Sequence, residues 1–195
     1  MNSVHSDSLQ FLRSQLAAAW ARGVRQCVVV GSRLRLREAF ESSPENDLQV
    51  FTVDEHPASG SQDIFVPTQF VSETLSAALR KVDFDKRKAS LFVWLYGAGY
   101  RTMEAVLASF GFIASLPKGS GVVFDYAVER SAEGSVTQTA LDALASAVST
   151  AGKLKYLIQP QAVAAMLRGL GFEQIVDFAQ EEACVADGHL VSAVV

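Results

Sequence analysis

Two hydrophobic patterns alternate along this chain. Short continuous apolar runs, typical of strands that are buried on both faces, are separated by segments in which apolar residues recur every three or four positions, as in helices. The clearest strand is SLFVWLY at 90–96, and the clearest helix is 102–115. The predicted strands are 26–30, 48–53, 64–66, 90–96, 121–126, 172–178 and 189–195. The predicted helices are 6–21, 33–42, 72–82, 102–115, 137–151 and 160–170.

This order predicts an α/β fold. Strands that are separated by helices of this length form a parallel sheet with helices on both faces, in a doubly wound, Rossmann-like arrangement. No helix separates the last two predicted strands, 172–178 and 189–195. These two strands can therefore pair antiparallel at the C-terminal edge of the sheet.

Composition narrows the class of protein. The chain has 195 residues, 49% hydrophobic and 19% charged, which predicts a single domain over 1–195 and excludes a disordered chain. The net charge of −4 gives no reason to expect a nucleic-acid partner. The most apolar stretch is too short to span a bilayer, so we expect no membrane contact. Two cysteines, Cys27 and Cys184, are predicted to be buried free thiols in a cytoplasmic protein.

The ends of the first two strands carry the best candidate chemistry. Gly31 follows the first strand, and Asp54 ends the second, 23 positions later. In doubly wound sheets a glycine turn of this kind lets the backbone approach a ligand, and an acid at this spacing accepts hydrogen bonds from ribose hydroxyls. A purely structural turn is an equal alternative. The nearby Arg33, Arg35 and Arg37 would in either case favour an anion.

Several segments also resemble one known family. QCVVVGSRLRLREAF, FTVDEHP, VPTQF and the long block from Leu91 to Tyr126 are similar to motifs of the leucine carboxyl methyltransferase-like group of S-adenosylmethionine-dependent methyltransferases. The resemblance spans about Gly23 to Phe178. It implies a Rossmann-like methyltransferase sheet whose cofactor-binding half is 23–126 and whose C-terminal half is 127–195, after an opening helix in 1–22.

The resemblance also implies individual roles. Asp54 matches the acid that binds the ribose, and Gln69 stands where the family has an aspartate that contacts the adenine amino group. Tyr100 matches a tyrosine of the following loop, which implies contact with the substrate. The implied cofactor-binding residues are Gly31, Ser32, Arg37, Asp54, Thr68, Gln69, Trp94 and Leu95. No catalytic residue and no metal ligand is implied.

The sequence departs from the family at its first motif. Arg33 replaces the second glycine and Arg35 replaces an aspartate, which adds bulk and charge beside a sulfonium cofactor. The family's long segment before the first strand has no counterpart in these 195 residues, so we expect an open cleft. A second subunit could cover such a cleft, which makes a homo-oligomer an alternative to a monomer.

Three functions follow from these observations. The first is methyl transfer from S-adenosylmethionine to an oxygen of a small molecule or carboxylate. The second is a catalytically inactive relative that binds a partner. The third is a binder of a phosphate-bearing nucleotide, which the lack of a G-x-G-x-x-G motif disfavours. We expect His56 to be a surface turn residue and Tyr126 to pack in the core, and the spacing of His189 from the other histidines does not suit a metal site.

Overall fold

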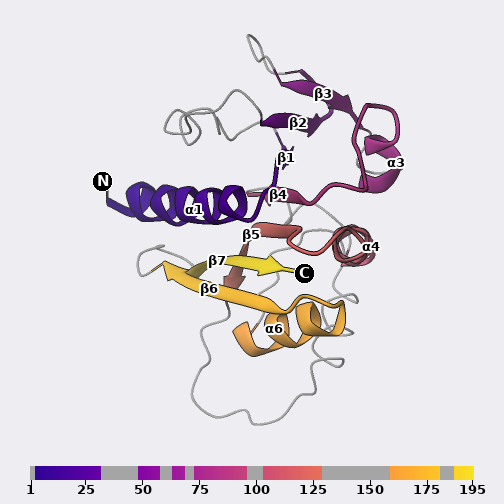
Figure 1. Cartoon of the computed structure of the whole chain (residues 1–195). Helices are drawn as coiled ribbons and strands as arrows, with labels where there is room; N and C mark the ends of the chain where they lie inside the picture. Colours follow the sequence, from indigo (N-terminus) through magenta and orange to yellow (C-terminus); the bar gives the residue numbers. More distant parts are fainter. Residues whose placement is uncertain are drawn as a thin grey trace.

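The computed structural model describes residues 3–31, 48–57, 63–68, 73–95, 103–128, 159–180 and 187–195. Its helices and strands follow one another along the chain as the hydrophobic pattern predicts (Figure 1). The helices are α1 (Ser3–Ala21), α3 (Leu75–Leu79), α4 (Met103–Ala114) and α6 (Pro160–Gly169). The strands are β1 (Gln26–Val30), β2 (Gln49–Asp54), β3 (Ile64–Pro67), β4 (Ser90–Trp94), β5 (Gly121–Val128), β6 (Gln174–Gln180) and β7 (Asp187–Val194).

All the described strands form one seven-stranded sheet with the order β3-β2-β1-β4-β5-β7-β6. The strands β1 to β5 are parallel neighbours, whereas β7 runs antiparallel to both β5 and β6. The predicted fold class is therefore confirmed, with its antiparallel pairing at the C-terminal edge. The reversed strand is β7, which lies one position in from the edge strand β6.

Two layers of helices cover the sheet, as Figure 1 shows for α1 on one side and α4 on the other. The larger core cluster joins α3, α4 and α6 to one face of the sheet, where Phe51, Phe92 and Phe110 are buried. The smaller cluster joins α1 to the opposite face through Leu12 and Leu16. The alternation of β1, whose five residues are all buried, sends neighbouring side chains into these two clusters in turn.

One helix is shorter than predicted, and one strand is shifted along the chain. The helix predicted over 72–82 is only α3, although Val82 still packs against the larger cluster. The chain after Leu79 is not helical, but it still brings Val82 to the core as the spacing predicts. The strand predicted to begin at Phe172 begins at Gln174, because Phe172 is itself buried in the larger cluster at the turn after α6. The helices predicted over 33–42 and 137–151 lie outside the described residues.

The thiol of Cys27 is free and buried, as predicted. Burial, and to a smaller degree the charge of Asp63, raises the pKa of Cys27 to about 12. Cys184 lies outside the described residues. Among the helices that the structure describes, none combines the length and the apolar character that a membrane span requires.

Candidate functional site

Gly31 ends β1 in a conformation that glycine adopts readily. Its φ is +94°, and its backbone N–H donates a hydrogen bond of 2.9 Å to the carbonyl of Val53 on the next strand. Among the described residues, no atom would lie within 4 Å of a Cβ atom built on Gly31. The positive φ is therefore a property of the turn, and the part of the chain that the structure describes does not crowd this position.

Asp54 is the last residue of β2, and its carboxylate is held by the turn that follows. Its Oδ1 accepts hydrogen bonds from the backbone N–H groups of Glu55, at 2.6 Å, and His56, at 3.3 Å. The side chain is half-buried at the carboxyl edge of the sheet. The local turn thus fixes the carboxylate next to the β1 turn, where the sequence predicted a ribose-binding acid.

Thr68 lies directly beside Asp54. The backbone N–H of Thr68 donates to the carbonyl of Asp54 at 3.1 Å, and the residue is only 5% exposed. The register that pairs Asp54 with Pro67 produces this contact. The structure therefore brings two of the predicted cofactor-binding residues together.

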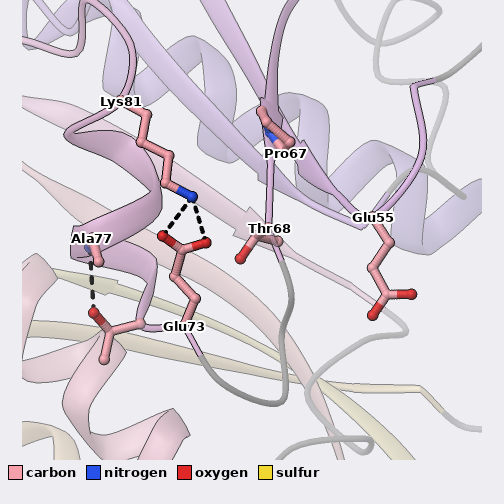
Figure 2. Close-up of a pocket in the computed structure, with 7 residues that line it drawn as sticks. Glu55, Pro67, Thr68, Glu73, Ala77 and Lys81 are labelled. Carbon is pink, nitrogen blue, oxygen red and sulfur yellow. Dashed lines mark hydrogen bonds and ion pairs between the residues drawn. The ribbon is translucent and has the colours of Figure 1, made fainter.

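A hollow of about 700 Å³ opens at this edge of the sheet, between the ends of β2 and β3 and the helix α3 (Figure 2). Figure 2 shows the ion pair between Glu73 and Lys81 on one side, with an Nζ to Oε1 distance of 2.7 Å. Thr74 accepts a hydrogen bond from the N–H of Ala77 and so caps α3. The lining residues are Glu55, Pro67, Thr68, Glu73, Thr74, Ala77 and Lys81.

Most of these lining residues were not predicted as part of a site. Glu55 adjoins Asp54 in the sequence, and Thr68 was predicted, but Glu73 and Lys81 are eight positions apart on either side of the short helix α3. Their sequence positions carry no motif. The signal that could have found them is their position just after the end of β3, at the ligand-binding edge of a parallel sheet.

Trp94 and Leu95 stand at the end of β4, as predicted, but their side chains point to opposite faces. Trp94 is 2% exposed and packs edge-on against Phe110, with ring centroids 6.0 Å apart, in the larger cluster. Leu95 belongs to the smaller cluster on the α1 side. Both side chains therefore serve the core, and their contact with a cofactor stays a prediction.

Four predicted residues lie outside the described residues. They are Ser32, Arg37, Gln69 and Tyr100, and the arginines Arg33 and Arg35 lie outside as well. Their roles stay predictions from the sequence. Among the residues that the structure does describe, no group of three or more histidine, cysteine or acidic side chains could hold a metal ion.

A second polar cluster lies on β5, β6 and β7. The carboxylate of Asp177 accepts a hydrogen bond of 2.5 Å from the hydroxyl of Tyr126 and lies 2.6 Å from Nδ1 of His189. Tyr126 packs against the larger cluster, which confirms its predicted place in the core. Burial, followed by the hydrogen bond and charge of Asp177, raises the pKa of Tyr126 well above its ordinary value. The positions of these three residues in the sequence do not indicate that they lie together.

Comparisons with known proteins give a fold and no closer family. No protein-family model matches the sequence, and no curated protein matches it either. A methyltransferase from Archaeoglobus fulgidus that depends on S-adenosylmethionine aligns with a TM-score of 0.57 at 12% identity, over 96% of this chain and 94% of its own. The chain has the methyltransferase fold.

Two further methyltransferases support this assignment. The N-methyltransferase NodS from Bradyrhizobium japonicum aligns with a TM-score of 0.54 at 12% identity, over 95% of this chain and 94% of its own. Magnesium protoporphyrin IX methyltransferase from Synechocystis, solved with bound S-adenosylhomocysteine, aligns with a TM-score of 0.56 at 12% identity, over 98% of this chain and 83% of its own.

The strand order of this fold shows where a ligand-binding crevice is expected at the carboxyl ends of the strands. The chain moves from β1 outward to β2 and β3 and then returns to the other side of β1 with β4. Such a reversal of strand order opens a crevice between β1 and β4 at the carboxyl ends of the strands, and ligands bind there. Gly31 and Asp54 lie at this crevice. The Tyr126–Asp177–His189 cluster lies on its far side, beyond β4.

Proposed function

We propose that this chain is an S-adenosylmethionine-dependent methyltransferase that acts on an oxygen of a small molecule. The observation that carries the proposal is the pairing of Gly31 and Asp54 at the crevice edge. A glycine turn of positive φ at the end of β1 lies beside a carboxylate that the β2 turn holds in place. The likeness to solved methyltransferases supports the same function.

The described residues suit S-adenosylmethionine chemically. Gly31 has no Cβ atom, so the methionine part can come close to the backbone there, and the Asp54 carboxylate can accept hydrogen bonds from ribose hydroxyls. The neighbouring hollow of about 700 Å³ has a usual size for a ligand pocket, and its lining includes Thr68 and Glu55 but neither Gly31 nor Asp54. The carboxylates of Asp54 and Glu55 favour a positively charged ligand at this edge. When bound, the cofactor would supply an activated methyl group.

The resemblance to the leucine carboxyl methyltransferase-like group supplies the finer proposal. It adds Ser32, Arg37, Thr68 and Gln69 to the cofactor site and Tyr100 to the acceptor side. In this proposal the half 23–126 binds the cofactor, and 127–195 forms the C-terminal half of the same domain. The small-molecule acceptor, the cytoplasmic location and a homo-oligomer stay predictions from the sequence.

Calorimetric titration with S-adenosylhomocysteine tests the proposal. We expect the wild type to bind and Asp54→Ala to lose at least tenfold in affinity, about 1.4 kcal/mol, because ribose hydroxyls lose a charged acceptor. Asp83→Ala is the matched control, since it removes an exposed carboxylate away from this edge. Equal affinities in wild type and Asp54→Ala would contradict the assigned role of Asp54.

The alternative functions give different results in the same experiment. An inactive relative would show no heat with S-adenosylmethionine or S-adenosylhomocysteine at millimolar concentration. A binder of phosphate-bearing nucleotides would respond to NADPH and not to S-adenosylhomocysteine. Either result would refute methyl transfer by this chain.

A further inference from the structure

The Tyr126–Asp177–His189 cluster lies at the same edge of the sheet as the crevice. Phe124 on β5 pairs with Trp94, the last residue of β4, and Tyr126 stands two residues further along β5. His189 on β7 is the direct partner of Tyr126. The register therefore places His189 level with the residues that follow β4, two strands away from β4 with β5 between them, on the side of the crevice opposite to Asp54.

The hydrogen bonds of the cluster favour one tautomer of His189. Asp177 uses one carboxylate oxygen for the Tyr126 hydroxyl and the other for Nδ1 of His189. A carboxylate can only accept hydrogen bonds, so Nδ1 carries the proton. The neutral imidazole then has its lone pair on Nε2, where it can accept a proton from another molecule.

The ring of His189 is held firmly. Its centroid is 5.3 Å from that of Tyr126, and the Tyr126 ring is 6.2 Å from Phe124, which is buried. The His189 side chain is 14% exposed and that of Asp177 is 28% exposed. The imidazole is thus oriented by packing and by a charged partner, while it keeps a limited access to solvent. An oriented imidazole of this kind is the usual form of a general base.

We propose that His189 is the general base of methyl transfer and that the acceptor is an alcohol or a phenol. Asp177 and Tyr126 are positioning residues that hold the imidazole in its Nδ1–H form. This inference rests on the proposed function and deepens it, because it selects one class of acceptor. A carboxylate is already ionised at neutral pH and needs no base, whereas a hydroxyl must lose its proton.

The chemical step balances with the residues present. S-adenosylmethionine, when bound, supplies a methyl group whose bond to sulfur breaks with both electrons kept by sulfur. The acceptor O–H bond breaks, and its proton passes to Nε2 of His189. The electron pair left on the acceptor oxygen forms the new O–C bond, so the products are a methyl ether, a neutral thioether and an imidazolium that later releases its proton to solvent.

Nitrogen NMR of the imidazole rings tests this inference without requiring turnover. The probe is catechol, a phenolic acceptor, added to the protein saturated with S-adenosylhomocysteine, and benzoate is the carboxylate comparison. The chain has three histidines, and the signals of His189 are the set that disappears in His189→Gln. We expect the Nδ1–H form of His189 in the wild type and a shift of its Nε2 signal with catechol but not with benzoate.

Asp177→Asn tests the positioning role. An amide can donate to Nδ1, so we expect the variant to move His189 toward the Nε2–H form and to lose the catechol response. Glu173→Gln is the matched control, since it removes an exposed carboxylate paired only loosely with Lys118 at 3.4 Å. Rates of radiolabelled methyl transfer to catechol should fall at least 100-fold in His189→Gln.

The outcomes separate this inference from the proposed function. Binding of S-adenosylhomocysteine without any response of His189 to catechol would overturn the base and leave methyl transfer standing. The same holds if His189 has the Nε2–H form, or if benzoate is methylated at equal rates by the wild type and His189→Gln. A wild type that fails to bind S-adenosylhomocysteine would overturn the proposed function itself.

Discussion

The two sides of the crevice are built in different ways. On the β2 and β3 side, Asp54 bonds to the backbone of the next two residues, and Thr74 bonds within its own helix turn. On the β5, β7 and β6 side, Tyr126, His189 and Asp177 come from three different strands and bond to one another. The first side depends on local turns, whereas the second depends on strand register.

Because of this difference, we expect substitutions on the two sides to affect ligand binding and the stability of the sheet to different degrees. A change at a local turn should affect the ligand and leave the sheet intact. A change in the second cluster, or in the strand spacing that supports it, should affect the sheet as well. Four substitutions test the contrast, in order of decreasing expected effect.

Gly121→Ala should cause the largest loss of stability. A Cβ atom at this position in β5 would lie 2.6 Å from the carbonyl oxygen of Ala193 in β7, so the two strands must move apart. We expect a loss of about 2 kcal/mol in the free energy of unfolding, measured in urea. The displacement should also alter the His189 signals, while binding of S-adenosylhomocysteine stays within twofold of the wild type.

Gly111→Ala is the control for this substitution. Gly111 lies inside α4, and within the described part of the chain a Cβ atom there would meet nothing within 4 Å. Alanine in a helix interior is expected to stabilise by about 0.5–1 kcal/mol. Similar effects of the two substitutions would show that the β5–β7 spacing does not limit stability.

Gly31→Ala should have a smaller effect on the fold and a distinct effect on binding. No atom of the described residues crowds this position, so we expect the cost to arise from the positive φ and to amount to about 1–2 kcal/mol. Because the backbone relaxes at the β1 turn, we also expect weaker binding of S-adenosylhomocysteine in calorimetry. Gly169→Ala in α6 has the same open surroundings without a positive φ, and its stability should not fall.

Tyr126→Phe should cost about 1 kcal/mol at neutral pH, because Asp177 loses a hydrogen bond. The pKa of Tyr126 is raised in the folded protein, mainly by burial. An unfolded tyrosine ionises near pH 10, so the folded wild type loses stability as the pH rises above about 10. The advantage of the wild type over Tyr126→Phe should therefore shrink above that pH. A difference that is constant from pH 7 to 10.5 in urea unfolding would contradict this assignment.

Glu73→Gln should have the smallest effect. Lys81 is 52% exposed, and exposed ion pairs contribute about 0.2–1 kcal/mol and weaken in salt. We expect a loss of about 0.5 kcal/mol or less, which should disappear in 1 M NaCl because the Debye length falls to about 3 Å. A larger, salt-independent loss would mean that the hollow beside α3 supports the fold.

The sequence predicted the parallel part of the sheet well. The run from Gln26 to Val30 is continuously apolar because both faces of β1 are covered, and that pattern suits little else. The α3 segment shows what hydrophobic spacing alone does not predict. The spacing of Leu75, Leu79 and Val82 correctly predicts burial, but it does not decide whether a helix or a turn delivers Val82 to the core.

The candidate site was predictable only where it is local. Asp54 could be found because it ends a strand at a fixed spacing from Gly31, and both belong to one βαβ unit. Asp177 and His189 are diagonal neighbours on one face of the sheet only because two antiparallel strands pair in one register, with Phe178 opposite Leu190. Shifting that register by one residue would send these side chains to opposite faces, and no local signal in the sequence specifies it.

The position of β7 has a consequence for how the chain assembles during synthesis. The strands β1 to β5 can pair as soon as they leave the ribosome, but β6 is made before β7 and has no partner until β7 fills the place between β5 and β6. The edge of β5 stays open during that interval, and open edges invite pairing with other chains. Completion of residues 187–194 therefore ends the period in which a nascent chain is most exposed to aggregation, and brings Tyr126, Asp177 and His189 together in the same event.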